Sequence, residues 1–529
     1  MAVIGSTVTT QSVGPSQIPV VGYSSGFFVV QAPRGEAGVV KRCASFGQFL
    51  RYFGGLDRLV TLAAGTAADT WSYETSADVV QGYYGVKAFF ENKGSGSPGI
   101  AYVVRATQTS SPPTAATKNF PDATVNNTAV TSKWLGAHGG TTLVTVTNPS
   151  PVKGTGFAQF RVEFSRASIV EYWEIANAAD AADASRRSEL VTITLPAGLQ
   201  LPVTAAQSKI GNAPGTQGTA DAYAATAANY VGTLAATGAR TGLKCFEADK
   251  TLGSGMVAFP GKYDSTSRAA LLAHAATYNR VAYLGGPSAL DQSSVVTDKS
   301  TSAGDGMYYW PQMLQSDENT GGTLLVDPVG YVMGMQARMD RDYGGPHKSA
   351  AGVTHPIYGA IDVERQSNGM EKIDDDVVNT LADSFINCIR GNKGIYVFGL
   401  RTLSADNRYR QSNVMRTVKM IQATLFEIGS AVAMEPIDSR GRLFSRLKSD
   451  CSVFLEGLRA AGALYGTEPG KDLKPTDAYF VFCDEGNNTV NTLSQGQVVV
   501  DVVIKPTTNA EQIRFNLFVA APGAFATRP

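Results

Sequence analysis

The feature that most constrains the fold of this sequence is a regular apolar stripe in its last quarter, residues 394–529. The stripe alternates spacings of four and three residues and consists of Val414, Val418, Ile421, Leu425, Ile428 and Val432. Because an α-helix has about 3.6 residues per turn, this spacing places the side chains on one helical face. A second stripe consists of Leu443, Leu447, Cys451, Phe454 and Leu458. Pro436 lies between the stripes, so the sequence predicts two successive helices.

Runs typical of β-strands lie on either side of the helix pair, at 395–398, 478–483, 498–504 and 513–519. A strand that close to the end of a chain can complete its own sheet or be donated to a neighbouring subunit. The sequence leaves both alternatives open. The candidate residues of such a C-terminal arm are Ile513, Phe515, Leu517 and Val519.

The N-terminal residues, 1–17, carry no charged side chain and no helical period. Their Thr and Val content favours strands, so we expect this segment to order by pairing with the edge of a sheet elsewhere. The candidate strand residues of this N-terminal arm are Ser6, Thr7, Val8, Thr9 and Thr10.

Strands and helices alternate over 18–107 and again over 240–400. We expect helices at 45–55, 76–92, 265–279 and 330–339, and strands at 27–30, 101–105, 256–259, 281–284 and 323–326. Helical spacing of Val377, Leu381, Phe385 and Cys388 predicts a further helix, which glycines at 391 and 394 end. Strand–helix–strand units of this length favour parallel pairing.

The composition changes at 108, where Thr, Ser, Pro, Asn and Gly become frequent. Apolar and polar residues alternate with period two at 143–147, 160–164 and 190–195, as in half-buried strands. We interpret 108–235 as a mainly β insertion. With 401–529 as a C-terminal domain, the chain is a multidomain protein of α/β and α+β class.

Composition excludes several function classes. Lys plus Arg and Asp plus Glu are both 45, so the net charge gives no electrostatic case for nucleic acid. No run approaches the ~18 apolar residues of a membrane span, and the N-terminus does not resemble a secretory signal. The five cysteines form no CxxC pair, which favours buried, reduced thiols in a cytoplasmic setting. Charged residues are only 17%, which fits a protein that associates.

A search for chemistry yields no catalytic, cofactor or metal site. The four histidines lack the spacing of a helical metal pair, and no GxSxG or phosphate-binding loop occurs. We interpret the acids at 374–376 as the first turn of a helix, and the polar stretch 483–488 as a turn between strands. A chain of this length without convergent reactive groups is expected to be structural rather than catalytic.

Four stretches nevertheless resemble, in the same order along the chain, motifs of the contractile tail sheath proteins of phages and related injection machines. They are APRG at 32–35 with FGG at 53–55, FFEN at 89–92 and YVVR at 102–105; DPVGYVMG at 327–334 with ARMD at 337–340 and KSA at 348–350; GLRTLS at 399–404 with NVMR at 413–416; and EP at 435–436, FL at 454–455, GALYG at 462–466, CDE at 483–485 and NT at 488–489. The insertion carries little of this signature. The early "PGVY" motif of the family is missing, and 509–513 departs from its usual segment.

The resemblance implies a subtilisin-like α/β core at 240–400 without a catalytic triad, and arms that complete sheets in adjacent subunits. It implies a virion protein, assembled in the host cytoplasm, whose copies stack as hexameric rings in a helix around an inner tail tube protein. Baseplate and tail terminator proteins would be further partners, without direct nucleic acid contact or membrane insertion. Contraction would drive the tube through a cell envelope and deliver a genome or effectors.

Within this resemblance the C-terminal domain would face the tube, and its candidate tube-facing residues are Arg416, Lys419 and Lys471. Ordinary solvated charges remain the alternative for all three. Two other classes of protein also stay open. One is a β-rich baseplate or receptor-binding tail protein, suggested by 108–235, and the other is an α/β hydrolase-like enzyme, for which no nucleophile and base can be nominated.

Overall fold

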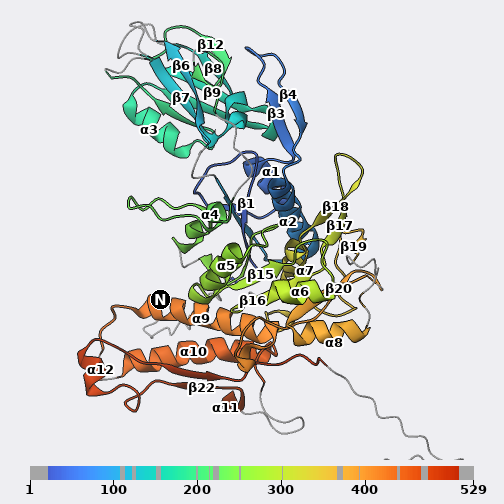
Figure 1. Ribbon diagram of the computed structural model, residues 1–529. Helices are drawn as coiled ribbons and strands as arrows, with labels where there is room; N and C mark the ends of the chain where they lie inside the picture. Colours follow the sequence, from blue (N-terminus) through green and yellow to red (C-terminus); the bar gives the residue numbers. More distant parts are fainter. Residues whose placement is uncertain are drawn as a thin grey trace, which may run out of the picture.

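The computed structural model is a mixed α/β protein with several sheets (Figure 1). It describes residues 22–511, except for 108–112, 122–126, 150–155, 198–200, 214, 219–225, 249–251, 301, 366–372, 374, 392, 438–440 and 466–474. The arm residues Ser6 to Thr10 and Ile513 to Val519, and also Lys471, lie outside the described residues.

An eight-stranded sheet forms the centre of the molecule, in the order β2-β5-β1-β14-β15-β16-β20-β21. Its strands are β1 (Gly26–Val30), β2 (Lys41–Cys43), β5 (Ala101–Arg105), β14 (Met256–Ala258), β15 (Val281–Gly285), β16 (Gly306–Trp310), β20 (Ile386–Arg390) and β21 (Tyr396–Phe398). The six inner strands are parallel, and β2 and β21 close the two edges in antiparallel orientation. The parallel pairing expected from the sequence is confirmed, and one sheet draws strands from both 18–107 and 240–400.

Helices cover both faces of this central sheet. On one face lie α1 (Phe46–Phe53), α2 (Ala77–Lys93) and α7 (Val329–Tyr343), and on the other lie α4 (Ala227–Val231), η3 (Gly242–Glu247), α5 (Ser265–Thr277), α6 (Gln292–Lys299) and α8 (Asp375–Asp383). Helices α2 and α7 touch through their backbones, because a Cβ at Gly330 would lie 2.0 Å from the carbonyl oxygen of Gly85. The central sheet is therefore buried on both faces, as parallel sheets are.

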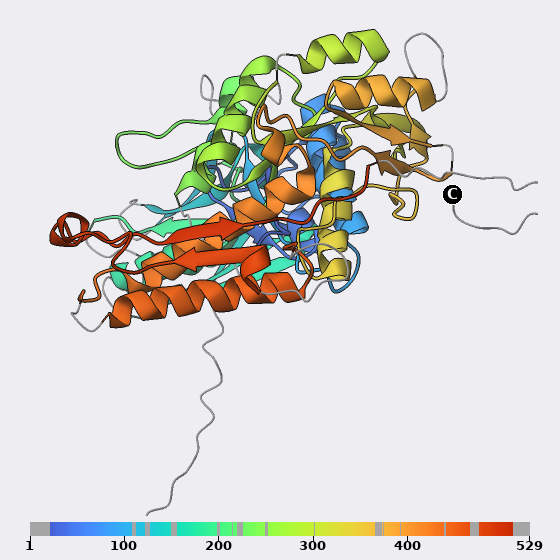
Figure 2. The ribbon, with the colours of Figure 1, turned by 90° about the horizontal axis from the view of Figure 1, so that it is seen from below.

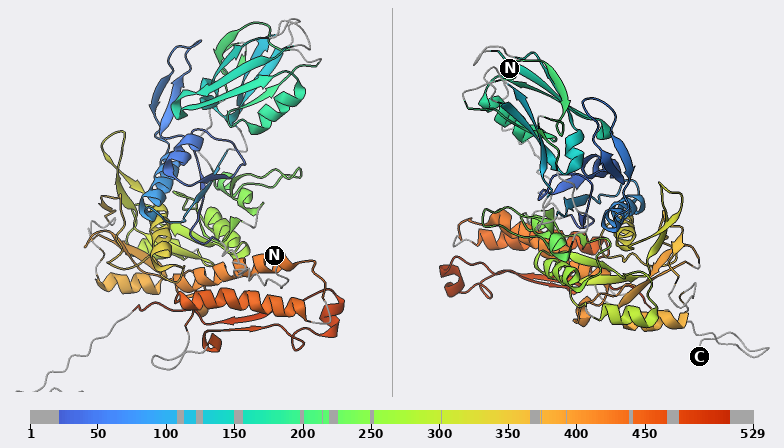
Figure 3. Two further views of the ribbon diagram at one scale, coloured as in Figure 1. Left: turned by 180° about the vertical axis from the view of Figure 1, so that it is seen from behind. Right: turned by 45° about the horizontal axis from the view of Figure 1, so that its top comes forward.

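Between β5 and β14 the chain forms an antiparallel sandwich of two four-stranded sheets (Figures 1 and 3). One sheet has the order β10-β9-β8-β12 and the other β11-β7-β6-β13. The elements are β6 (Ala115–Pro121), β7 (Asn127–Leu135), η1 (Ala137–Thr141), β8 (Leu143–Thr147), β9 (Ala158–Phe164), η2 (Ser165–Ala167), β10 (Ile169–Ile175), α3 (Ala178–Arg187), β11 (Val191–Thr194), β12 (Ala206–Lys209) and β13 (Gly215–Thr216). Its core joins Val146 and Phe160 of one sheet to Val130 and Ile193 of the other. The three strands expected from period two are confirmed as β8, β9 and β11.

Two smaller sheets lie outside the central sheet. A hairpin pairs β3 (Asp57–Thr61) with β4 (Thr70–Tyr73), and a three-stranded sheet has the order β18-β17-β19, from Thr323–Val326, Met313–Ser316 and Asp362–Val363. Within the described ranges, none of the helices combines the length and apolarity that crossing a membrane requires.

The C-terminal part forms a separate layer of helices and strands below the centre in Figure 1, seen from its free side in Figure 2. It consists of η5 (Asn407–Tyr409), α9 (Ser412–Val432), α10 (Arg442–Ala460), α11 (Pro475–Ala478), β22 (Tyr479–Phe482), α12 (Val490–Ser494) and β23 (Asp501–Ile504). Both predicted helices are confirmed as α9 and α10, and residues of both stripes share one core with β22. The stretch 483–488 is a turn, as predicted, but it leads from β22 into the short helix α12 and not directly into a second strand.

The helix predicted through Cys388 is wrong in its second half. Helix α8 ends at Asp383, and Phe385 reverses the chain with a φ of 61°. Residues Ile386–Arg390 are strand β20, which pairs in parallel with β16 inside the central sheet. A buried parallel strand is apolar on both faces, so its apolar residues can coincide with helical spacing by chance.

Candidate functional site

The C-terminal sheet contains two strands, β22 and β23, that pair antiparallel. One face of this pair packs against α10, because Val481 is buried and Tyr479, Val502 and Ile504 are half-buried in the same core. The chain folds this way locally because residues alternate inward and outward along both strands. An isolated two-stranded ribbon is only marginally stable, so α10 provides the support that the pair needs.

The other face of this sheet is open and apolar. Phe480 and Val503 lie directly opposite each other across the two strands, and they are 48% and 62% exposed. Phe482 stacks on Phe480 with ring centroids 6.3 Å apart. Among the described residues, β22 and β23 form a sheet only with each other, and an antiparallel bridge joins Leu464 to Pro506 just beyond β23. The edge of a two-stranded sheet can be a template for a further strand.

The tube-facing candidate Arg416 points into the molecule. Its side chain is 3% exposed and forms a bidentate ion pair with Asp340 of α7, at 2.6 and 2.7 Å. The pair also binds the start of the described chain, because Arg416 Nη2 donates to the Tyr23 carbonyl oxygen and Ser24 Oγ donates to Asp340. Burial opposes the guanidinium charge, but Asp340 outweighs burial and raises the pKa of Arg416.

The second described candidate, Lys419, also turns toward the centre. Its ammonium pairs with Asp305 at 2.5 Å, and its side chain is 11% exposed. Asp305 directly precedes β16, so this contact places α9 beside the amino-terminal ends of the parallel strands. Both Arg416 and Lys419 thus join the C-terminal layer to the central sheet within one chain, and neither offers a free charge to another protein.

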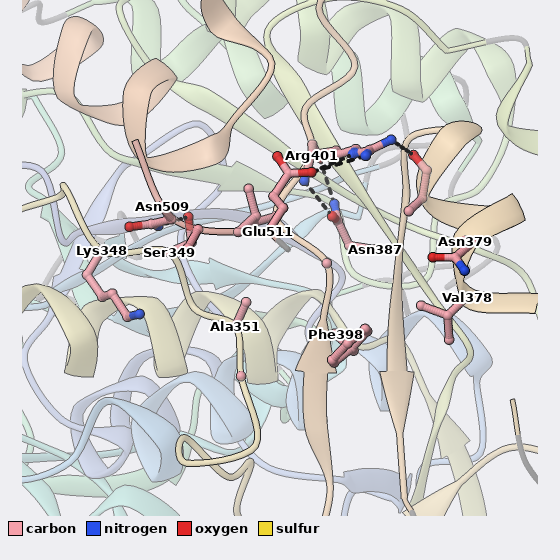
Figure 4. Close-up of a pocket in the computed structure, with 15 residues that line it drawn as sticks. Lys348, Ser349, Ala351, Val378, Asn379, Asn387, Phe398, Arg401, Asn509 and Glu511 are labelled. Carbon is pink, nitrogen blue, oxygen red and sulfur yellow. Dashed lines mark hydrogen bonds and ion pairs between the residues drawn. The ribbon is translucent and has the colours of Figure 1, made fainter. Parts of the chain in front are cut away.

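A cavity of about 350 Å³ lies where the central sheet, α8 and the C-terminal chain meet (Figure 4). Asn387 and Phe398 line it from β20 and β21, and Asn509 and Glu511 line it from the end of the described chain. Arg401 crosses its rim, donating to Glu511 on one side and to Asp383 of α8 on the other. The described chain therefore ends in a polar corner that is already closed by an ion-pair network.

The reactive side chains of the described part are arranged for structure. All five cysteines are free and buried, as expected. Burial raises the pKa of Cys43 and Cys388 to about 12, which holds these thiols protonated and unreactive. Burial lowers the pKa of His138 to about 3 and that of His274 to about 4. No group of three or more His, Cys, Asp or Glu among the described residues could hold a metal ion.

Several residues that build this region were not singled out from the sequence. Asp340 and Glu511 hold the junctions described above, and Gln411 and Asn413 bind the chain at Asn509 and Thr507; only tertiary contacts reveal these roles. A signal did exist for two of them, since Asp340 and Asn413 lie in stretches that resemble the sheath family.

No protein-family model and no curated protein matches this sequence. Solved structures do match. A chain of the anti-feeding prophage baseplate is 15% identical, with a TM-score of 0.52 over 98% of this chain and 99% of that one. A sheath chain from a contracted extracellular contractile injection system (PVC) is 15% identical, with a TM-score of 0.51 over 98% and 99%.

A sheath tail protein from Listeria innocua is 14% identical, with a TM-score of 0.54 over 87% of this chain and 89% of that one. These similarities cover nearly the whole chain, including the sandwich and the C-terminal layer. The resemblance found in the sequence motifs is thus matched independently in three dimensions. This chain has the fold of the contractile tail sheath proteins.

Proposed function

We propose that this chain is the structural subunit of a contractile tail sheath. Copies polymerise as hexameric rings that stack helically around an inner tube. Contraction of the sheath then drives the tube through a cell envelope and delivers a genome or effectors. The proposal places the protein in a tail particle that is assembled in the host cytoplasm, with the tube, baseplate and terminator proteins as partners.

The observation that carries this proposal is the similarity of fold along almost the entire chain to sheath chains of contractile systems. A single shared domain would be weaker support, because one fold serves many functions. Here the similarity extends over 98% of this chain. Deeply buried thiols and histidines with lowered pKa give no support to the hydrolase alternative.

The open C-terminal sheet supplies a physical route to assembly. Strands donated by the arms of neighbouring copies would hydrogen-bond to the outer edges of β22 and β23 and extend the sheet beyond two strands. Their apolar side chains would lie beside Phe480 and Val503 on the open face and enlarge its apolar surface, which is exposed in the single chain. Contacts of this kind are heterologous: those within a ring of six would close, and those between rings that do not close would generate a helix.

Within this proposal the domains keep the boundaries expected from the sequence. Residues 1–17 and the C-terminal end act as arms, 18–107 is an N-terminal α/β part, 108–235 is an insertion, 240–400 is a subtilisin-like domain, and 401–529 forms the layer nearest the tube. Continuous arms can stay attached while the bodies slide, which allows two packings of the same subunits.

Negative-stain microscopy of the purified chain tests this function. Helical tubes of uniform diameter are the expected result, if necessary after addition of the tube protein. Fibres or trimers would instead favour the receptor-binding alternative, and discrete particles without any tubes at high concentration would contradict the sheath proposal.

Truncation separates the arms from the body. Chains that lack 1–16 or 512–529 should remain folded, with unchanged thermal unfolding, but should no longer form tubes. In a matched control, a Gly/Ser sequence of equal length replaces the same residues. It keeps the length of the arm and removes its strand propensity. Normal tubes from the truncated chains would refute strand donation by the arms.

A further inference from the structure

The last described residues of the chain are fastened to the start of α9. Asn413 Nδ2 donates to the Thr507 carbonyl oxygen at 2.7 Å. Gln411 and Asn509 form a reciprocal pair, because Gln411 Nε2 donates to the Asn509 carbonyl oxygen at 3.0 Å and the Asn509 amide donates to Gln411 Oε1 at 2.8 Å. These bonds fix the backbone of 507–509 in one position and direction.

An ion pair completes this attachment at Glu511. Arg401 Nε and Nη2 donate to Glu511 Oε2 at 3.2 and 3.1 Å (Figure 4). Gln411 Nε2 donates to Glu511 Oε1 at 2.8 Å. Burial opposes ionisation of Glu511, but the bonds from Gln411 and Arg401 outweigh it and lower the pKa of this carboxyl. Arg401 also donates to Asp383 and to the Ala382 carbonyl oxygen, so α8 braces the same corner.

The first described residues of the chain are fastened to the same helix. Arg416 Nη2 donates to the Tyr23 carbonyl oxygen at 3.2 Å, and Ser24 Oγ donates to Asp340, the partner of Arg416, at 2.9 Å. Gln336 Nε2 also donates to Asp340 and fixes the orientation of the carboxylate. Gln411 and Arg416 are five residues apart, which is only about 8 Å along a helix axis.

We propose that residues 411–416, at the start of α9, are a common anchor for the two terminal segments. Each segment then leaves the body from a rigid and nearly shared point. The consequence for assembly rests on the function proposed above. If neighbouring copies hold the far ends of both arms, tension in one arm reaches the other through one and a half helical turns, and not through the whole body.

The anchor itself is testable in the free subunit by hydrogen exchange of the full chain. Glu511→Gln should speed exchange of the 507–511 amides about tenfold, because it removes the charge that Arg401 binds. Ser24→Ala should speed exchange near Tyr23 by about fivefold, since it removes one neutral hydrogen bond. Glu435→Gln is the matched control, because it neutralises an acid paired with exposed Arg446 far along the same layer.

If the anchor is shared, loosening either terminal segment should also speed hydrogen exchange at the start of α9. The Met415 amide donates to the Gln411 carbonyl oxygen at 3.1 Å and reports on the first helical turn. Each single variant should speed its exchange about twofold, and the combined Ser24→Ala/Glu511→Gln variant about fourfold. Changes confined to 507–511 in one variant and to Tyr23 in the other would overturn the common anchor.

The assembled state gives the functional readout. Both variants should unfold at the wild-type temperature, yet form fewer or shorter tubes than the wild type and Glu435→Gln. Faster exchange near Tyr23 and at 507–511 together with normal tubes would show that the anchor does not serve assembly, and would overturn that part of the inference. Absence of tubes from the wild type would refute the sheath function instead, while the exchange results still decide the anchor.

Discussion

The central sheet and the C-terminal sheet are built by opposite rules. The central sheet has eight strands, helices on both faces, and antiparallel strands closing its edges. The C-terminal sheet has two strands, one covered face, and exposed Phe480 and Val503 on the other. The first has both faces covered within one chain, and the second has only one face covered. Under the proposed sheath function, the open face is where a neighbouring copy would add material.

The largest effect is expected from a substitution at the junction between the two regions. Arg416→Ala leaves Asp340 buried and unpaired, so the free energy of unfolding should fall by about 3–5 kcal/mol. Urea unfolding of the single chain measures this loss. The matched control Arg459→Ala removes a partner of Glu456 on α10 whose side chain is 27% exposed, and it should cost far less. Equal losses for both variants would mean that the buried junction does not hold the regions together.

The second test is pH, because we expect acid to destabilise the region that contains the histidines before the C-terminal layer. All four histidines lie in the first 355 residues, and burial lowers the pKa of His274 to about 4 from an ordinary value near 6.5. Between these values the unfolded state binds more protons, so stability is full above pH 6.5 and falls as the pH drops toward 4. We expect His274 alone to cost about 3 kcal/mol over this range.

Unfolding curves at pH 7, 5.5 and 4 measure that slope. His274→Gln should be less stable at neutral pH but should show a shallower pH dependence than the wild type. The C-terminal residues 401–529 contain neither histidine nor tryptophan, so tryptophan emission reports only on the other regions. As the pH falls, we expect tryptophan emission to change before the C-terminal layer unfolds. An identical slope in wild type and variant would exclude His274 as the source.

Substitutions on the two faces of the C-terminal sheet sharpen the comparison further. Val481→Ala, on the face packed against α10, should cost about 2 kcal/mol, because it removes two buried methyl groups and leaves a cavity. Phe480→Ser, on the open face, should cost well under 1 kcal/mol in the single chain. Tube formation should show the reverse order, with Phe480→Ser the more damaging at temperatures where both variants are folded.

The smallest expected effect concerns the half-buried ion pair of Arg161 and Glu163 on the sandwich. Glu163→Gln should change the free energy of unfolding by no more than about 0.5 kcal/mol, since surface pairs contribute little. Calorimetry of the wild type and variant measures this difference. A larger loss would mean that the sandwich depends on surface charge more than its buried core suggests.

Much of the fold was predictable, for reasons that particular elements show. The stripes at 414–432 and 443–458 have one possible period, and they form α9 and α10. The strands β8, β9 and β11 follow period two because one of their faces is buried and the other is not. Strand β20 was missed because it is buried on both faces, and its apolar residues carry no period that separates a strand from a helix.

The site was less predictable. Arg416 and Lys419 lie off the apolar stripe of α9, and that position indicates solvent when only one face of a helix is buried. In this fold the first half of α9 is enclosed on both sides, so the same positions carry Arg416 to Asp340 and Lys419 to Asp305. The contacts of Gln411 and Glu511 join residues about a hundred positions apart, and no local pattern encodes them.

The sequence by itself determined which segments become helices and strands wherever burial is one-sided, because periodicity records which face meets the core. It also determined the resemblance to sheath proteins, through short motifs in a fixed order. Only the tertiary structure decided which strands share a sheet, which charges are buried as pairs, and which face of the C-terminal sheet stays exposed. Those outcomes depend on contacts between distant residues, whose energies arise only when the chain has closed around its core.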